Sequence, residues 1–377
     1  MKKQASKAVF TSAATIAEDI IRRRLQIGIP CPALPSVQNI ARAANRHRQH
    51  QRPRHPTDLD FELQEDHVGE RFVRADVRVK NNRHIILATD AQLDLLVRAK
   101  TWYIDGTFKV VREPFVQLAS IHAFIKKDGI VKQEPLCFMY MSSRKRRDYV
   151  AVLRKVLEML PGPPAVIGVV SDFERALWKA VSQVLVWAKH RGCSFHWGQS
   201  VWRKIQEKGL AKSYTDQNGV YRYCRKLLGL PYLPAASITS VFQQLEGQAN
   251  TTQLQELVAY INNTWITTNL WPPAAWSVYG QPIRTNNDVE GWHHRLNRKA
   301  NNNGLNMYLL FSLLKQEAEM VEIDAQLMSD NKVRRNQRKA TCNMQSKING
   351  YWREYEDGTR TISRLLSACA RLYAPHQ

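Results

Sequence analysis

A short apolar run, Ala165-Val166-Ile167-Gly168-Val169-Val170, ends just before Ser171-Asp172. Its length and its β-branched residues predict a strand that is buried inside a sheet. A helical periodicity over 148–160 precedes this strand, and another helix is expected from Phe173 to Val186. A buried strand with a helix on either side in the chain indicates an α/β layer.

Upstream of this strand, three apolar segments with strand-like alternation are separated by charged or turn-like residues. They lie at 102–110, 116–124 and 136–141, and we expect them to form a three-strand meander. Downstream, residues 192–195 are expected to add one more strand. The predicted order of elements is therefore β-β-β-α-β-α-β.

Residues from 198 to 284 show mostly helical periodicities and few strand signals. A last long helical stretch begins near Asp288, restarts after 301–304, and carries an apolar face that should close one side of the sheet. We therefore divide the chain into a basic, partly helical N-terminal arm (1–80), the first part of an α/β core (81–197), a helical insertion (198–284), the last part of the core (285–328) and a basic C-terminal tail (329–377).

The composition favours a protein with a substantial core and a polyanionic partner. Of 377 residues, 44% are hydrophobic, and 55 Lys and Arg against 33 Asp and Glu give a net charge of +22. Nucleic acid is the partner that this charge favours. An anionic membrane surface is the competing interpretation, but no basic amphipathic helix and no stretch of ~18 apolar residues stands out. The start of the chain shows no secretory signal segment, and the six cysteines lack CxxC pairs, so we expect a reducing compartment rather than a disulfide framework.

Two basic runs are candidates for phosphate contact. Residues 42–55 carry five arginines and three histidines without one acid; such a run is either simply solvated or contacts phosphate, and the sequence favours neither. The second run is Arg144-Lys145-Arg146-Arg147. It is interpreted as a DNA contact or a nuclear import signal, and a chance cluster in a basic chain is the alternative.

Three acids stand in unusual local settings: Asp105 in Tyr103-Ile104-Asp105-Gly106-Thr107, Asp172 directly after the buried strand, and Glu290 in Asn287-Asp288-Val289-Glu290-Gly291-Trp292. Each has a structural alternative. Asp105-Gly106 is a strong hairpin-turn signal, Asp172 could cap a helix, and Asn287 with Glu290 matches a capping box. Taken singly, these structural interpretations are favoured.

Taken together, the three acids predict a metal site. One carboxylate lies in the first strand of the meander, one at the carboxyl end of the buried strand and one on a helix expected beside them. Mg²⁺ and Mn²⁺ prefer carboxylate oxygens, and two such ions ~4 Å apart can clamp both oxygens of a phosphodiester displacement.

Four short motifs in this order resemble those of the Mutator-like element (MULE) transposases. They are Trp102-Tyr103-Ile104-Asp105-Gly106-Thr107-Phe108-Lys109, Ser171-Asp172-Phe173-Glu174, Gly192-Cys193-Ser194-Phe195-His196-Trp197 and Arg284-Thr285-Asn286-Asn287-Asp288-Val289-Glu290-Gly291-Trp292-His293. The resemblance spans roughly residues 80–325 and is closest to the animal branch, in which a FLYWCH zinc finger often precedes the core.

This resemblance implies a ribonuclease H-like fold, an α/β core of mixed sheet and flanking helices, and a DDE-type catalytic triad of Asp105, Asp172 and Glu290 that binds two Mg²⁺ or Mn²⁺ ions. It implies a reaction in which water nicks the DNA at an element end and the freed 3′-hydroxyl then attacks target DNA. The implied partner is double-stranded DNA, both terminal inverted repeats and target, bound by a homodimer or larger assembly in the nucleus, with no membrane involved.

The resemblance also singles out Cys193 and His196 as the CxxH element of the family. They are interpreted either as zinc ligands, which would need two further ligands from residues such as His293 or His294, or as a buried cysteine and a histidine that hydrogen-bonds near the active site. Flanking the glutamate, Arg284, Trp292, His293 and Arg295 are predicted DNA contacts. A core position is the alternative for Trp292.

Two classes of function remain open on sequence grounds. The first is an active, metal-dependent DNA transposase, which the three intact acids favour. The second is a DNA-binding descendant whose chemistry has lapsed, since no Cys/His cluster that could form the expected zinc finger precedes the core. Another ribonuclease H-like nuclease is a weaker alternative, because it would not explain the CxxH and glutamate motifs.

Overall fold

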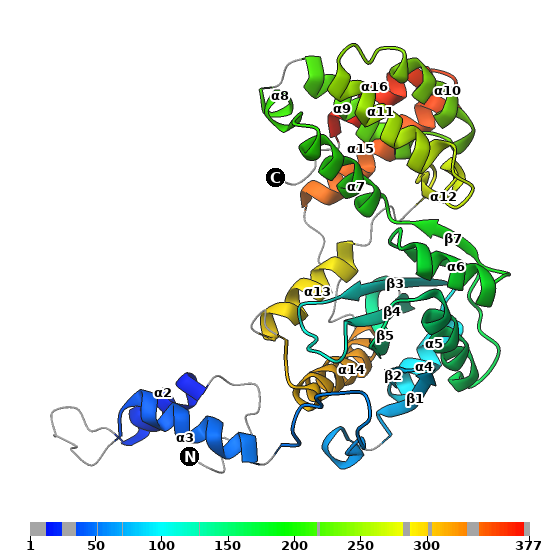
Figure 1. Ribbon diagram of the computed structural model, residues 1–377. Helices are drawn as coiled ribbons and strands as arrows, with labels where there is room; N and C mark the ends of the chain where they lie inside the picture. Colours follow the sequence, from blue (N-terminus) through cyan, green and yellow to red (C-terminus); the bar gives the residue numbers. More distant parts are fainter. Residues whose placement is uncertain are drawn as a thin grey trace.

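The computed structural model describes residues 13–24, 35–50, 52–69, 71–127, 129–216, 219–281, 287–300, 304–329 and 339–372. A seven-stranded mixed sheet lies at its centre (Figure 1). The strands are β1 (Val73–Val79), β2 (Asn82–Leu87), β3 (Thr101–Thr107), β4 (Gln117–Lys127), β5 (Ile130–Met141), β6 (Gly168–Ser171) and β7 (Lys189–Gly192). Their order is β1-β2-β5-β4-β3-β6-β7; β6 is parallel to β3 and β7, and all other neighbours are antiparallel.

Helices cover both faces of the sheet because side chains alternate along its strands. One face packs on α4 (Asp90–Arg98), α5 (Arg146–Met159) and α6 (Arg175–Val184), where Trp102 and Ile104 of β3 are buried. The other packs on α13 (Asn287–Lys299) and α14 (Met307–Ser329), where Phe138 of β5 meets Trp292 and Phe311. This confirms an α/β fold of mixed sheet and flanking helices, consistent with the ribonuclease H-like expectation.

The core begins earlier in the chain than the sequence predicts. The β1–β2 hairpin adds two strands beyond β5, although most of β1 falls within the expected arm (1–80). β1 is the edge strand, and its alternating charged residues remain partly exposed. Charged side chains are typical of edge strands, where they discourage pairing with other chains. This charge concealed the strand pattern in the sequence.

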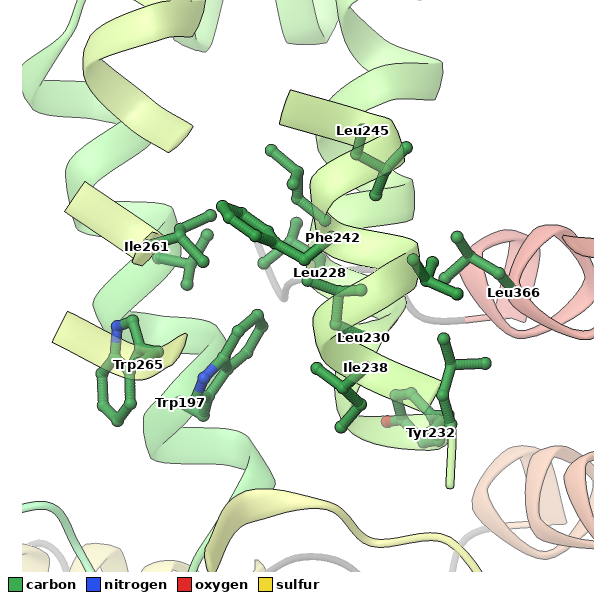
Figure 2. Close-up of a cluster of buried hydrophobic side chains, with 14 of the residues drawn as sticks. Trp197, Leu228, Leu230, Tyr232, Ile238, Phe242, Leu245, Ile261, Trp265 and Leu366 are labelled. Carbon is green, nitrogen blue, oxygen red and sulfur yellow. The ribbon is translucent and has the colours of Figure 1, made fainter. Parts of the chain in front are cut away.

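A second unit consists of helices alone. It contains α7 (Ser194–Glu207), α8 (Ala211–Thr215), α9 (Gly219–Gly229), α10 (Ala235–Glu246), α11 (Thr252–Ile261) and α12 (Pro273–Trp276), with the short helices η2 (Leu230–Tyr232) and η3 (Asn262–Ile266). Figure 2 shows its apolar centre, in which Trp197, Phe242 and Trp265 are buried. The tryptophans at 197, 265 and 276 thus belong to its core, whereas the Trp187 side chain is exposed.

The segment expected to be a basic tail (329–377) contains two helices that complete this unit. α15 (Lys339–Glu356) and α16 (Ile362–Leu372) pack against α9, and Trp352, Leu366 and Cys369 join the same apolar cluster. The Trp352 indole N–H donates to the Tyr232 carbonyl at 2.9 Å. The helical spacing of these apolar residues was not recognised because the preceding residues 332–347 are highly charged. Residues 330–338 lie outside the description.

The N-terminal arm contains the helices α2 (Ala13–Arg24) and α3 (Val37–His50). Their apolar contact is made by Ile16, Ala17, Ile20 and Ile40, and the pair lies beside the core rather than in it (Figure 1). The arm is joined to the core through His55, whose ring nitrogens lie 2.6 Å from the Glu113 carbonyl and 3.1 Å from the Met307 amide. Within the described parts of the chain, no helix has the length and hydrophobicity needed to cross a bilayer.

Candidate metal centre

Parallel pairing of β3 and β6 places Asp105 and Asp172 next to each other. Ile104 of β3 pairs with Ser171 of β6, and Asp105 and Asp172 are the residues that directly follow this pair. Asp105-Gly106 does not form a hairpin turn, because both residues lie inside β3 and pair with Ser120 and Ala119 of β4. Equivalent positions on neighbouring strands point to the same face. The two carboxyl groups therefore share one face at the carboxyl ends of their strands.

Local hydrogen bonds hold both aspartates. The Gly106 amide donates to Asp105 Oδ1 at 2.8 Å, and the Glu174 amide donates to Asp172 Oδ1 at 3.2 Å. The Trp178 indole N–H donates to the backbone carbonyl of Asp172 at 2.6 Å, which ties the start of α6 to the end of β6. Asp172 is not the N-cap of α6, which is Glu174; its carboxylate instead stabilises the turn that precedes the helix, and it keeps further acceptor sites.

Glu290 and His196 complete the group. Glu290 lies in the first turn of α13, and its Oε1 is 2.9 Å from Nε2 of His196 on α7. One ligand atom each from Asp105, His196 and Glu290 lies within 4.8 Å of the others. Asp172 is not in this group of three, but it lines the same small cavity as Asp105. Three carboxyl groups and one imidazole thus meet where β3, β6, α7 and α13 converge.

The electrostatics of the group reflect burial and crowding. The pKa of Asp105 is raised to about 7: burial is the main cause, the nearby carboxylates of Glu290 and Asp172 act in the same direction, and His196 opposes them. Burial also raises the pKa of Asp172. For Glu290, burial also acts to raise the pKa, but the hydrogen bond and charge of His196, the charge of His293 and a hydrogen bond with Asp105 together lower it below its ordinary value. The carboxyl groups therefore repel one another in a poorly solvated place, and a cation between them relieves this repulsion.

His196 supplies part of the compensating charge. Burial alone would lower its pKa, but hydrogen bonds with Cys193 and Glu290 raise the pKa to about 11. The imidazole is therefore protonated at neutral pH. Its neighbours are hard carboxylate oxygens, which fit Mg²⁺ or Mn²⁺ better than a soft metal. The donor set at this site thus suits the divalent cations that the sequence predicts.

A comparison with known families agrees with this geometry. Residues 101–200 match the family model of the MULE transposase domain. The chain contains a MULE transposase domain. The matched segment runs from the start of β3 into α7, so it includes Asp105, Asp172, Cys193 and His196, whereas Glu290 lies outside it. No curated protein matches the chain.

The CxxH element lies at the start of a helix rather than in a strand. The expected strand at 192–195 is displaced: β7 ends at Gly192, and α7 begins at Ser194. The buried Cys193 donates its amide to the Ser171 carbonyl at 2.9 Å and so fixes the first turn of α7 beside Asp172. One helical turn separates Cys193 from His196, which lets their side chains hydrogen-bond. This supports the hydrogen-bonding interpretation; zinc ligation stays a prediction, and the metal-ligating group found among the described residues contains His196 without Cys193.

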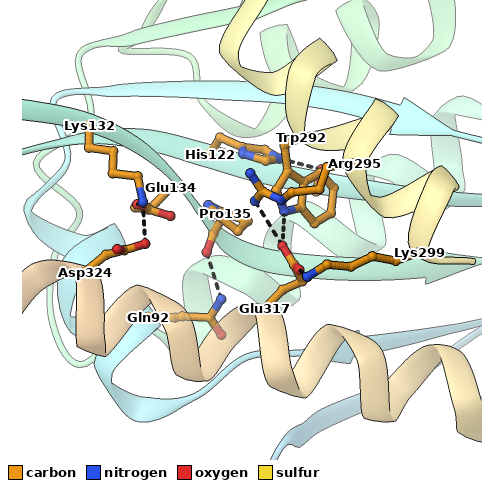
Figure 3. Close-up of polar contacts among 11 residues, drawn as sticks. Gln92, His122, Lys132, Glu134, Pro135, Trp292, Arg295, Lys299, Glu317 and Asp324 are labelled. Atoms are coloured by element: carbon orange, nitrogen blue, oxygen red, sulfur yellow. Dashed lines mark hydrogen bonds and ion pairs between the residues drawn. The ribbon is translucent and has the colours of Figure 1, made fainter. Parts of the chain in front are cut away.

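Two of the predicted DNA contacts that follow Glu290 in the sequence are buried. Trp292 is 4% exposed, stacks on Phe138, and donates its indole N–H to Glu317 at 2.8 Å (Figure 3). His293 is 5% exposed, and its Nδ1 lies 3.9 Å from Asp105 Oδ2. Burial lowers the pKa of His293 to about 4, so its ring is neutral. Both side chains face inward because α13 packs against the sheet at this point, so neither is available to stack on DNA.

The other predicted contacts lie at the surface. Arg295 is about half exposed and donates to Glu317 at 3.1 Å (Figure 3). In the basic run 144–147 all four side chains are exposed, and the Arg144 guanidinium lies 4.8 Å from the ring centre of Phe108. This run opens α5 and is available to phosphate. Arg284 lies outside the described residues.

Glu317 is the functional neighbour that the sequence analysis missed. This buried carboxylate of α14 accepts hydrogen bonds from Trp292, Arg295 and Lys299, all on one face of α13 (Figure 3). It thereby fixes the rotation of the helix that carries Glu290. The available signal was a pair of acids, Glu317 and Glu319, inside the largely apolar stretch 309–321, and nothing in the sequence indicated which of them is buried or what its partners are.

Proposed function

We propose that this chain is a metal-dependent DNA transposase of the MULE type, with Asp105, Asp172 and Glu290 as its catalytic carboxylates. The observation that supports this most strongly is the convergence of the three acids: two on paired parallel strands of the MULE domain and one on a helix whose glutamate lies within ligand distance of Asp105. Three acids with no common role would not be expected to gather in a poorly solvated place.

In this proposal the carboxylates hold Mg²⁺ or Mn²⁺, which supplies Lewis-acid stabilisation of charge on the scissile phosphate. The chain's own residues do the rest. Asp105 and Asp172 are fixed by the sheet and by backbone amides, so they are preorganised. His196 orients Glu290 and balances its charge. Exposed cations at 144–147 lie on the loop that follows β5 and would bind the DNA backbone.

The reaction class is phosphodiester hydrolysis at an element end, followed by attack of the freed 3′-hydroxyl on target DNA. In this reaction class a water molecule and then the 3′-hydroxyl are the nucleophiles, so no protein nucleophile is required. We further propose that two copies or more act together to join two DNA ends, and that the protein works in the nucleus. Light scattering of the protein on paired end DNA and imaging of a tagged chain test these two points.

A strand-nicking and strand-transfer assay tests the proposed activity. Purified protein is incubated with Mn²⁺ or Mg²⁺ and with DNA carrying the inverted repeats that flank the gene. We expect nicking at the repeat ends that EDTA abolishes and that Asp105→Asn and Glu290→Gln each remove. Asp94→Asn, an exposed acid on α4 of the same domain, is the matched control and should nick like the wild type.

The alternative function is a DNA-binding descendant without chemistry. Such a protein would still bind DNA, because the net charge of +22 supports DNA binding with or without catalysis. Tight, salt-sensitive binding with no metal-dependent nicking under any of these conditions would favour this alternative over the transposase.

A further inference from the structure

A groove of about 710 Å³ is lined by residues of α4, β3, β4, β6 and β7 and by Ser277, Val278 and Gln281. Five of its lining residues are basic: Arg98, Lys100, Lys126, Lys127 and Arg191. None of its described lining residues is acidic. The rest of the lining is mostly apolar, including Tyr103 and Phe124. A pocket that combines cations with an aromatic floor suits an anionic ligand that also has flat apolar faces.

The groove begins next to the candidate metal centre. Tyr103 and Val170 both line it, and they precede Asp105 and Asp172 by two residues on β3 and β6. Side chains two residues apart lie on the same face of a strand and about 7 Å apart. Arg191 pairs with Val170 across β6 and β7, so it stands in the same row. If a polymeric ligand binds with its reacting group at the carboxylates, the neighbouring monomer of the polymer would therefore lie in the groove.

Arg191 is the best evidence that the ligand is anionic. Its side chain is partly buried in the groove, and burial lowers the pKa of its guanidinium. Across the described residues, no carboxylate or other group forms a hydrogen bond or ion pair with this guanidinium. A partly buried arginine with unused donors is costly unless an anion binds it. Arginine presents a planar fork of donors that matches phosphate.

The size and floor of the groove indicate which nucleic acid fits. Its volume lies in the range of sites for small organic ligands, roughly 300–1,000 Å³, which accommodates one or two nucleotides but no duplex. Tyr103 and Phe124 pack edge to face with ring centres 5.3 Å apart, and the ring of Phe124 is partly exposed in the lining. Unpaired bases stack on such rings without sequence preference.

We propose that this groove binds a single-stranded DNA segment next to the scissile phosphate, with Arg191 and the four lysine and arginine side chains on its phosphates and Phe124 against a base. The proposal rests on the proposed function, since it assigns the groove to the same DNA substrate. It adds a prediction that double-stranded binding alone does not make: the protein should favour DNA with an unpaired strand beside the element end.

Binding measurements in EDTA separate this proposal from catalysis. Fluorescence anisotropy of the full chain would compare a blunt duplex with the same duplex bearing a short unpaired overhang. We expect the overhang to raise affinity, and Arg191→Gln to lower the affinity for overhang DNA by about tenfold while blunt-duplex affinity changes less than twofold. For single strands, each lost phosphate contact should reduce the slope of log affinity against log salt by about 0.7.

Controls make the result specific to the groove. Lys155→Gln removes an exposed cation of α5, which covers the opposite face of the sheet, and should not change overhang affinity. If Arg191→Gln fails to fold by circular dichroism, the double variant Lys100→Gln/Lys126→Gln, at two exposed positions, replaces it.

Three results would overturn the proposal. The first is no preference for the overhang; the second is an equal loss on blunt and overhang DNA in the groove variants, which would indicate a general basic surface. The third is binding that is not specific for DNA. An RNA overhang that binds as tightly as the DNA overhang, or a polyglutamate peptide that competes as well as overhang DNA, would contradict a site for DNA. A different outcome would separate the two proposals. If the wild type never nicks DNA but the groove variants still lose overhang binding, the proposed activity is rejected and the proposed binding site in the groove is supported.

Discussion

His196 on α7 and Glu290 on α13 form an ion pair, with Nε2 and Oε1 2.9 Å apart. The two helices belong to different parts of the chain, since α7 opens the helical unit and α13 returns to the core. The pair therefore connects the first turn of the helical unit to the metal centre. Its orientation depends on Cys193, which holds the start of α7 against β6.

His196→Ala should lower nicking by roughly 10- to 100-fold, the usual loss when a group that orients a metal ligand is removed. Without the imidazolium, Glu290 loses its hydrogen-bond partner and the charge that favours its ionised form. Single-turnover nicking rates at saturating Mn²⁺ measure the effect. His50→Ala, an exposed histidine of α3, is the control, and an unchanged rate in His196→Ala would remove the ion pair from the account.

Asp105→Asn should abolish the increase in melting temperature that Mn²⁺ causes. We expect Mn²⁺ to raise the melting temperature of the wild type in proportion to RT ln(1 + [Mn²⁺]/Kd) and to leave Asp105→Asn unchanged. In EDTA the variant should be at least as stable as the wild type, because Asp105 is a buried carboxylate beside two others. Differential scanning fluorimetry provides both comparisons. An equal Mn²⁺ shift in variant and wild type would exclude Asp105 as a ligand.

Glu317→Ala should destabilise the core by about 2–4 kcal/mol, because it leaves a buried indole N–H without an acceptor and two cations without their partner. Glu317→Gln keeps an acceptor for the indole and should lose less. Urea unfolding of both variants is the measurement, with Glu319→Ala, an exposed acid on the same helix, as control. Similar losses at positions 317 and 319 would show that the α13–α14 contact does not depend on this carboxylate.

Glu134 makes the stability of the core depend on pH. Burial raises its pKa to about 7, although the Lys132 ammonium 2.7 Å away opposes this; Asp324 binds the same ammonium (Figure 3). Because the folded pKa lies above the ordinary value of 4.5, folding takes up a proton between these pH values, and the free energy of unfolding falls as pH rises through this window.

Glu134→Gln removes this titration and should flatten the fall by up to about 3 kcal/mol. Urea unfolding at pH 5 and pH 8 measures the difference in wild type and variant. Glu158→Gln, which breaks an exposed pair with Lys155, should keep the wild-type pH dependence. A variant curve at position 134 parallel to that of the wild type would contradict the raised pKa.

Short apolar patterns in the sequence were sufficient to predict most of the central strands of the sheet. The strand expected at 165–170 is found as β6 at 168–171, and the meander upstream is also present, because buried strands consist of apolar, β-branched residues; these strands place Asp105 and Asp172. The start of β6 was predicted too early, since Ile167 is exposed. The edge strand β1 was missed because charged residues alternate along it and none of its residues is fully buried. The apolar spacing of α16 was overlooked because basic residues precede it.

The site needed tertiary information that one sequence does not contain. The acids at 105, 172 and 290 were found through motifs, but the contact of His196 with Glu290 and of Glu317 with α13 joins helices whose relative placement no local periodicity encodes. For the same reason Trp292 and His293 were assigned to the DNA surface: their place beside the glutamate in sequence does not tell which side of α13 faces the sheet. Arg191 lies in a short strand without any motif, so only the fold draws attention to it.

Asp172 provides the most direct test, because it is the proposed ligand that lies outside the group of three closest donors. The measurement is the single-turnover rate of Mn²⁺-dependent nicking at the element end by wild type and Asp172→Asn, with DNA affinity measured in parallel. The account predicts a loss greater than the roughly 100-fold upper range for an outer partner, with affinity within about threefold because binding rests on the basic surface. Nicking by Asp172→Asn at the wild-type rate would contradict the three-carboxylate centre.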